Sequence, residues 1–236
     1  MVGALINAVG IALGSLVGLL LRGKISQRLV DSLMIAMGLV VVVLGVQSAV
    51  GSQEFLCVVL SLAFGAIIGE LMHIDRALDG IGDKVRKKLE GKKIAEGRFA
   101  EGFITASLLF GVGTMAILGS IEAGISSNYE ILITKTVMDT ISAAALCAAL
   151  GLGVGLSLVP VFIWEGGIAL LAGVLAPLFT PEVIAEMTAV GGAIFIGMGL
   201  NMTDITDRKI NVANMIPALF IPIIYFPLAN LIGGIF

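Results

Sequence analysis

Along the chain, long stretches of mostly apolar residues are separated by short polar loops. Each stretch is close to the ~20 residues that a helix needs to cross a bilayer. The pattern predicts an all-α, polytopic transmembrane bundle that forms a single integral membrane domain over residues 1–236. We expect eight spans, at residues 3–22, 29–50, 54–74, 100–122, 131–155, 158–178, 183–202 and 210–235.

The one long polar segment, residues 75–99, follows the third span. Apolar residues recur there every three or four positions and basic residues fill the positions between them, which is typical of an amphipathic helix. We expect this segment to be a cytoplasmic helix or loop. Its basic residues 84–93 are a candidate contact for anionic lipid, and a solvated helix that anchors the loop is the alternative. Nothing indicates a nucleic-acid partner.

Composition agrees with a membrane protein, because 58% of the residues are hydrophobic and only 13% are charged. No charged side chain precedes Arg22, so the first segment is expected to remain as a span and not to be cleaved as a signal peptide. Cys57 and Cys147 lie inside apolar stretches and lack the spacing of a metal or disulfide motif. We expect both to be buried, reduced thiols.

Loop charges predict the orientation. In the eight-span arrangement, 13 of the 14 Lys and Arg residues fall on one side of the membrane, with Lys135 as the exception. Acidic residues mark the opposite side: Glu54, Glu122, Glu130, Glu182 and Glu186. Because cytoplasmic loops carry an excess of Lys and Arg, the N- and C-termini are predicted to lie outside and loop 75–99 inside the cell.

A weak internal repeat is visible. The sequence Gly10-Ile11-Ala12-Leu13 recurs at residues 167–170, and the next span in each half carries two glycines seven residues apart followed by an amide. The two glycines and the amide are Gly38, Gly45 and Gln47 in the first copy, and Gly192, Gly199 and Asn201 in the second copy. We therefore divide the chain into a first repeat at residues 1–74, central spans at residues 100–157 and a second repeat at residues 158–236. The copies would cross the membrane in opposite directions, as in many secondary transporters, although chance matches among such residues are common.

Glycines in the spans have two interpretations. Gly10, Gly14 and Gly18, like Gly65 and Gly69, follow the small-xxx-small spacing that lets helices approach closely. Two other places combine backbone weakening with polar side chains and are predicted to be broken helices. They are Gly191-Gly192 with Gly197, Gly199 and Asn201, and Asn214 with Pro217.

Charged residues inside the spans are the strongest functional candidates. Lys135 and Asp139 stand four positions apart, so they share one helix face and can pair. Either Asp139 binds a cation or proton with Lys135 as its counter-charge, or the two form a structural ion pair. Glu165 lies roughly two turns into the sixth span, where a carboxylate needs a partner, an aqueous cavity or a proton.

Neutral polar residues in the spans are candidate ligands for a dehydrated cation or an organic solute, although helix-to-helix hydrogen bonds explain each of them equally well. They are Asn7, Ser107, Thr114, Ser142, Asn201 and Asn214. Glu70 and His73 lie near the cytoplasmic end of the third span, where side chains reach water.

Nucleotide-binding, metalloprotease and serine-hydrolase motifs are lacking, and the single His precludes a cluster of histidines. We therefore expect no enzyme activity, no resident metal and no cofactor other than Na⁺ or H⁺ as a coupling ion.

The chain resembles the YqgA/YdfK-like bacterial inner-membrane proteins, a family with a domain of unknown function, over its full length. The resemblance rests on GALINAVGIALGSLVGLLLRGKI, AMGLVVVVLGV, GAIIGELMHID, TASLLFGVGTMAILGSI, KTVMDTISAAALCAALGLGV and GMGLNMTDI with KINVANMIPAL. It implies a multi-span protein of the bacterial cytoplasmic membrane without an established substrate. It also implies Lys and Asp at positions 135 and 139, but Gln where this chain has Glu165.

These observations favour an ion-coupled secondary transporter for a small solute or ion, with a midplane site lined by spans five to seven and the Asn214-Pro217 break. An ion channel and a membrane scaffold whose basic loop binds a soluble partner are the alternatives. Glycine-lined helices are also compatible with a homo-oligomer.

Overall fold

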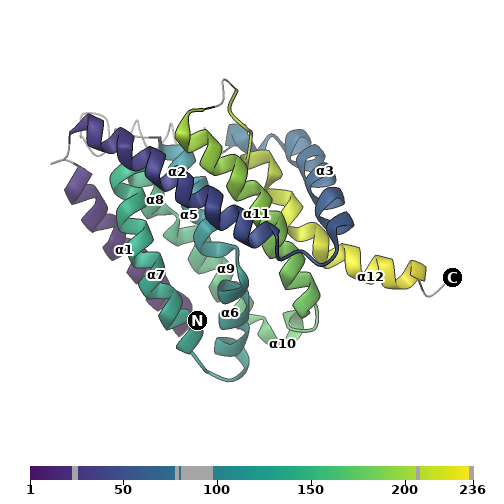
Figure 1. Cartoon of the computed structure of the whole chain (residues 1–236). Helices are drawn as coiled ribbons and strands as arrows, with labels where there is room; N and C mark the ends of the chain where they lie inside the picture. Colours follow the sequence, from purple (N-terminus) through teal and green to yellow (C-terminus); the bar gives the residue numbers. More distant parts are fainter. Residues whose placement is uncertain (23–25, 78–79, 81–97, 206–207, 234–236) are drawn as a thin grey trace.

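The computed structural model describes residues 1–22, 26–77, 80, 98–205 and 208–233, and every regular element among them is a helix. The amphipathic segment predicted at 75–99 lies largely outside the described residues. The first elements are α1 Val2–Arg22, α2 Gln27–Ala49, α3 Phe55–Met72, α5 Phe99–Gly111, α6 Thr114–Ile125 and α7 Glu130–Leu150. The others are α8 Leu152–Leu156, α9 Leu158–Leu170, α10 Ala172–Leu175, α11 Pro181–Thr203, the 3₁₀ helix η2 Ala213–Phe220 and α12 Ile221–Gly233 (Figure 1).

Six spans within the described chain are long and apolar enough to cross a membrane, namely α1, α2, α3, α7, α8 with α9, and α11. The pair α5 and α6 adds a seventh if it is counted as one span bent by 57°. The last apolar helix, Ala213–Ala229, is shorter than these. The prediction of an all-helical membrane protein is thus confirmed.

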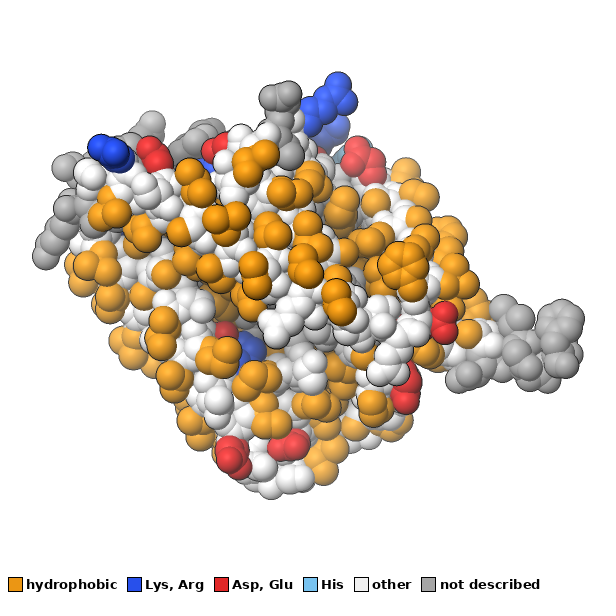
Figure 2. All heavy atoms as spheres, viewed as in Figure 1, with side chains coloured by type: hydrophobic (Ala, Val, Ile, Leu, Met, Phe, Trp, Pro, Cys, Tyr) orange, Lys and Arg blue, Asp and Glu red, His pale blue; other side chains and the backbone are white. Residues whose placement is uncertain are grey.

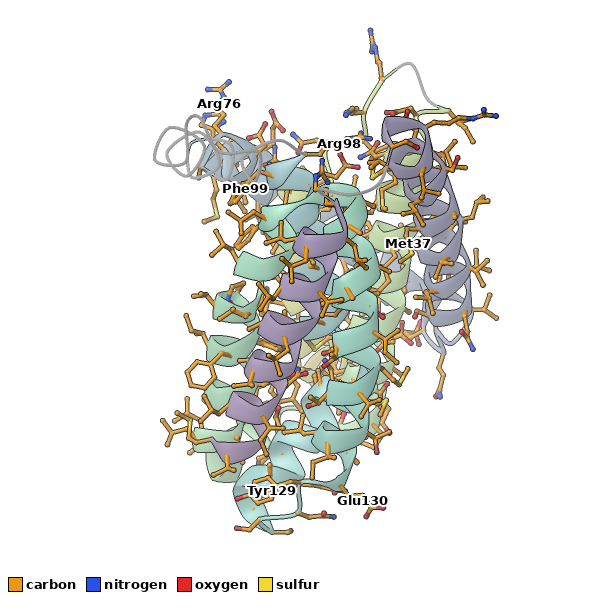
Figure 3. All side chains as sticks on the ribbon, turned by 90° about the vertical axis from the view of Figure 1, so that its left-hand side faces the viewer. Met37, Arg76, Arg98, Phe99, Tyr129 and Glu130 are labelled. Atoms are coloured by element: carbon orange, nitrogen blue, oxygen red, sulfur yellow. The ribbon has the colours of Figure 1, made fainter. Side chains whose placement is uncertain are left out.

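The outer surface is that of a membrane protein. Large apolar side chains cover most of the visible face as a broad band, and most charged side chains lie toward its two ends, apart from a small blue and red patch near the middle (Figure 2). Arg76 and Arg98 lie at one end of the bundle, while Tyr129 and Glu130 lie at the other (Figure 3). A surface with an apolar band between polar ends is suited to a bilayer and not to water.

Helices α1 and α7 run side by side (Figure 1), with backbones close together because α1 carries a stripe of glycines. A Cβ on Gly10 would come within 2.5 Å of Thr136 Cγ2, and Cβ atoms on Gly14 and Gly18 would overlap backbone carbonyls of α7. Arg22 at the end of α1 donates hydrogen bonds to the Ala149 carbonyl at 2.6 Å and the Ala148 carbonyl at 3.2 Å. The close packing predicted for this stripe is confirmed.

Helix α11 corrects one prediction, because it continues without interruption from Pro181 to Thr203 through the glycines expected to break it. The missing side chains of those glycines instead let α2 pack closely against α11. A Cβ on Gly199 would lie 2.5 Å from the Gly38 carbonyl oxygen, and one on Gly192 would lie 2.6 Å from the Gly45 carbonyl oxygen. In this helix the missing side chains serve contact between helices and not flexibility.

Breaks occur at two other glycines with positive φ. Gly113 (φ 152°) separates α5 from α6, so the span predicted at 100–122 is two helices at an angle. Gly151 (φ 90°) ends α7 at Leu150 and begins α8, so the fifth span stops short of residue 155. α9 likewise ends at Leu170 and not near 178. Glycine adopts these backbone conformations without the penalty that a Cβ imposes.

The predicted irregularity at Asn214 and Pro217 falls inside η2, where the backbone is a 3₁₀ helix before α12 begins. This segment packs against α3 because Gly65 and Gly69 leave no side chain between the backbones: Cβ atoms there would overlap Ala218 and Asn214. α12 continues from η2 toward the C-terminus at the edge of the bundle (Figure 1).

Candidate functional site

Four polar side chains from three helices meet in the apolar interior. Asn7 comes from the second turn of α1, Lys135 and Asp139 come from α7, and Glu165 comes from α9. We call these four residues the buried quartet. The i, i+4 spacing places Lys135 and Asp139 on one face of α7, as predicted, while Asn7 and Glu165 reach them from distant parts of the sequence.

Hydrogen bonds and ion pairs connect all members of the buried quartet. Lys135 Nζ forms a close ion pair with Asp139 Oδ2 and lies 3.3 Å from Glu165 Oε1. Asn7 Nδ2 donates to Asp139 Oδ2 at 3.0 Å and to the two Glu165 oxygens at 2.9 and 3.1 Å. One ammonium and one amide thus serve two carboxylates.

Burial makes this arrangement energetically important. Asn7 and Glu165 are 0% exposed, Lys135 is 6% exposed and Asp139 is 7% exposed. With all three ionisable groups charged, the quartet carries a formal charge of −1. A single charge inside an apolar bundle is costly, so one proton or one monovalent cation would complete its neutralisation. Asn7 Oδ1 is also buried without a hydrogen-bond partner in the described chain, which leaves an acceptor oxygen next to the carboxylates.

A glycine brings α1 and α7 together beside the quartet. Gly10, one turn beyond Asn7, faces Thr136 and Thr140 of α7, so α1 approaches closely enough for the Asn7 amide to reach Asp139. Next to Glu165, a Cβ on Gly166 would lie 3.3 Å from Met1 Sδ and in ordinary van der Waals contact, at 3.8 Å, with Ala4 Cβ of α1. The close approach that the quartet requires is therefore the one between α1 and α7 at Gly10.

Two other candidate ligands have structural partners elsewhere. Asn201 holds the chain after α11, because its amide donates to the Ile210 carbonyl at 2.8 Å and its oxygen accepts from the Ile210 N–H at 2.8 Å. Asn214 donates to Glu70 Oε2 at 2.7 Å and accepts from the Asp75 N–H at 2.9 Å. Their hydrogen bonds tie loops to helix ends and not to the buried quartet.

The candidate hydroxyls also lie apart from the quartet's hydrogen-bond network. Thr114 is exposed at the start of α6. The Ser107 hydroxyl is buried in α5 without a partner among the described residues and lines a separate cavity. Ser142 has no hydrogen bond that connects it to the quartet within the described part of the chain. Among the described residues, no group of three or more His, Cys, Asp or Glu side chains is placed to hold a metal ion.

One buried carboxylate escaped the sequence argument, which placed Glu186 among the acidic residues of the outer loops. The structure buries it in α11, where it accepts hydrogen bonds from the Gln53 N–H at 2.7 Å, the Glu54 N–H at 2.9 Å and the Ser52 hydroxyl at 2.8 Å. Glu186 therefore holds the loop that leads into α3. The only feature of the sequence that indicated burial of Glu186 was its position within the first two turns of an apolar span.

Nearly the whole chain matches a known family, since the model described as "Protein of unknown function (DUF554)" aligns with residues 2–227. The chain belongs to this family. A relative in Bacillus subtilis (strain 168), "Uncharacterized membrane protein YdfK", is 31% identical over 226 residues, which is 94% of each chain. "Uncharacterized protein YqgA" of Escherichia coli (strain K12) is 28% identical over 222 residues, covering 93% of this chain and 94% of the relative.

Membership in DUF554 agrees with the apolar surface in placing the chain in a membrane, because one relative is named as a membrane protein. The coverage of both relatives indicates that the whole bundle, from α1 into α12, is the shared unit. No solved structure matches the chain. Function must therefore be argued from the buried quartet itself.

Proposed function

We propose that this DUF554 protein is an ion-coupled secondary transporter of a small solute or ion, with alternating access around the buried quartet. The observation that carries the proposal is the ratio of charges: two carboxylates share one ammonium in an apolar interior. Ionisable residues inside a transmembrane bundle are costly, and they commonly mark ion or substrate pathways. A purely structural ion pair needs only Lys135 and Asp139, and leaves Glu165 unexplained.

Each member of the quartet has a role in this proposal. Asp139 and Glu165 bind the coupling cation, Na⁺ or H⁺, and the Asn7 amide positions both carboxylates. Lys135 is the internal counter-charge that partly neutralises the empty site and releases a carboxylate when the cation arrives. The quartet joins α1, α7 and α9, so a change in its charge alters the contacts among three helices at once.

An inverted repeat would supply the two alternating states, and the α2–α11 interface supports it. The sequence pairs Gly38 with Gly192 and Gly45 with Gly199, whereas the contacts are Gly38 with Gly199 and Gly45 with Gly192. Exchanging the repeats converts each contact into the other, as expected for elements related by a two-fold axis. The third spans, α3 and η2 with α12, also pack against each other. We propose that the repeats pair α1 with α9, α2 with α11, and α3 with η2 and α12.

Ion binding at the quartet is expected to stabilise the purified protein. At a Na⁺ concentration about 100-fold above Kd, mass action adds about 2.7 kcal/mol, which raises the melting temperature by about 5–10 °C for a chain of this size. The measurement is a melting curve in NaCl, KCl or choline chloride at equal ionic strength, repeated at several pH values to detect H⁺. Asp139→Asn is expected to abolish the ion-specific part of the shift.

Glu130→Gln is the matched control, because it removes a carboxylate from the exposed start of α7 and should leave the shift intact. Equal melting in all salts and a pH profile shared by wild type and Asp139→Asn would contradict ion coupling. In proteoliposomes, uptake of radiolabelled Na⁺ that saturates and depends on Asp139 would favour a carrier. Flux without saturation would favour a channel, and the absence of both Na⁺ and H⁺ flux would favour a scaffold.

We propose further that the protein lies in the cytoplasmic membrane with loop 75–99 inside and both termini outside, in eight crossings that include η2 with α12. Basic residues at one end of the described bundle support this orientation. Alkaline phosphatase fused after residue 236 is then expected to be active, and the same fusion after Ser26 is expected to be inactive. The reverse pattern would show the opposite orientation.

A further inference from the structure

The two carboxylates of the buried quartet differ in how well their charges are compensated. Lys135 Nζ forms its close ion pair with Asp139, one turn away on the same helix, and lies farther from Glu165, at 3.3 Å from Oε1. Asp139 is 7% exposed, whereas Glu165 is 0% exposed. Because an enclosed charge without a close partner is the most costly kind, the excess negative charge of the quartet is least tolerated at Glu165.

The surroundings of Glu165 supply no further positive charge. The ionisable groups that face it in the described chain are Lys135 and Asp139, both from α7. From α1 it meets the neutral amide of Asn7. Among the described residues of α5, α6, α8 and α10, which pack around α9, no charged side chain lies against this carboxylate. A bound cation or a proton must therefore balance the charge.

The contacts of the carboxylates favour a proton over a metal cation. Both Glu165 oxygens and Asp139 Oδ2 already accept N–H groups of Asn7, and Lys135 Nζ lies against one oxygen of each carboxylate. A dehydrated metal cation is held by several oxygen atoms that point toward it, and here the ammonium would repel it from close by. A proton avoids both difficulties, because it resides on a carboxylate oxygen and needs no volume of its own.

We propose that the coupling ion of the buried quartet is a proton, which resides on Glu165 while Lys135 and Asp139 remain paired. One H⁺ adds to the Glu165 carboxylate, without oxidation or reduction, and the formal charge of the quartet changes from −1 to 0. Na⁺ is then not a ligand of this site. The inference deepens the proposed ion coupling at the quartet and rests on it.

Protonation also changes what Asn7 contacts. In the ionised state Asn7 Nδ2 links α1 to both α7 and α9, because it donates to Asp139 and to Glu165. A protonated Glu165 presents an O–H to this amide, donor against donor. Half a turn of the amide presents Oδ1 instead, a buried acceptor that has no partner in the described chain. In that arrangement Lys135 still holds Asp139, but proton binding has removed one link between α1 and α7.

Infrared difference spectroscopy tests the assignment, because the C=O stretch of a protonated carboxyl group is separate from the bands of carboxylates and backbone amides. The purified full chain in micelles is titrated with acid in KCl. We expect a carboxyl band in the wild type that Glu165→Gln removes and that Glu130→Gln, at the exposed start of α7, retains. Labelling the side-chain carboxyl of glutamate with ¹³C should shift this band, and the same label in aspartate should leave it in place.

Three results would overturn the proposal. The first is a wild-type protein without such a band, and the second is a band that persists in Glu165→Gln or shifts with labelled aspartate. The third comes from replacing KCl with NaCl at equal ionic strength, which we expect to leave the band unchanged. Loss of the band in NaCl at the same pH would show that Na⁺ takes the place of the proton. The labelling needs only wild-type protein, so it decides the assignment if Glu165→Gln does not fold.

Failure of this inference can be distinguished from failure of the proposed transport. If Na⁺ stabilises the wild type but not Asp139→Asn, and no carboxyl band depends on Glu165, ion coupling stands and the proton assignment is wrong. If the band is present and depends on Glu165 but proteoliposomes show neither Na⁺ nor H⁺ flux, the quartet binds a proton as inferred and the transport proposal is wrong.

Discussion

Replacing Lys135 with Met is expected to lower the free energy of unfolding by about 3–5 kcal/mol, because it leaves Asp139 and Glu165 buried together without their ammonium. The methionine side chain has a similar length, so the loss comes from charge and not from a cavity. Asn7 donates to both carboxylates but brings no charge that offsets theirs. Denaturant unfolding of the purified protein in mixed micelles measures the change.

Two companion variants separate charge from packing. Lys209→Met makes the same substitution at an exposed position near the end of the bundle and is expected to change the free energy of unfolding by at most about 0.5 kcal/mol. Adding Asp139→Asn and Glu165→Gln to Lys135→Met removes every charge from the quartet and should recover most of the loss. A Lys135→Met protein as stable as the wild type would mean that the carboxylates do not depend on this ammonium.

The buried quartet shows how far local spacing predicts a site. Lys135 and Asp139 are one helical turn apart, so their pairing follows from helix geometry alone. Asn7 and Glu165 are 132 and 26 positions from Asp139 in sequence, and their meeting depends on how α1, α7 and α9 pack. The sequence therefore identified these two residues as candidates, while their common hydrogen-bond network required the structure.

Glycines mark the limit of the prediction, because the same residue type serves three purposes in this bundle. At Gly14 a missing Cβ lets α1 contact α7, at Gly113 a positive φ breaks a span, and at Gly167 the absence of a side chain leaves a cavity. Spacing of four positions, small-xxx-small, identified the first class correctly. At Gly192 and Gly199 the expected break was wrong, because their partner helix α2 lies more than 140 residues away in sequence.

Gly69→Ala is expected to destabilise the protein by about 1–3 kcal/mol although it adds only one methyl group. The new Cβ would overlap the backbone carbonyl of Asn214 in η2, and a backbone atom cannot rotate away as the end of a side chain can. Separating α3 from η2 would also disturb the hydrogen bonds of Asn214 with Glu70 and with the Asp75 N–H. Both effects act on the same interface, so the loss should be large for so small a change.

Gly167→Ala provides the matched comparison and is expected to have the opposite sign. It is the same substitution in a helix of an apolar span, but its Cβ would meet nothing within 4 Å, so the helical preference of Ala over Gly should raise the free energy of unfolding, by up to about 1 kcal/mol. Denaturant unfolding of both variants measures the difference. Equal stabilities would mean that α3 and η2 can separate at little cost, and that α3 is not held to the second half of the bundle by the contact at Gly69.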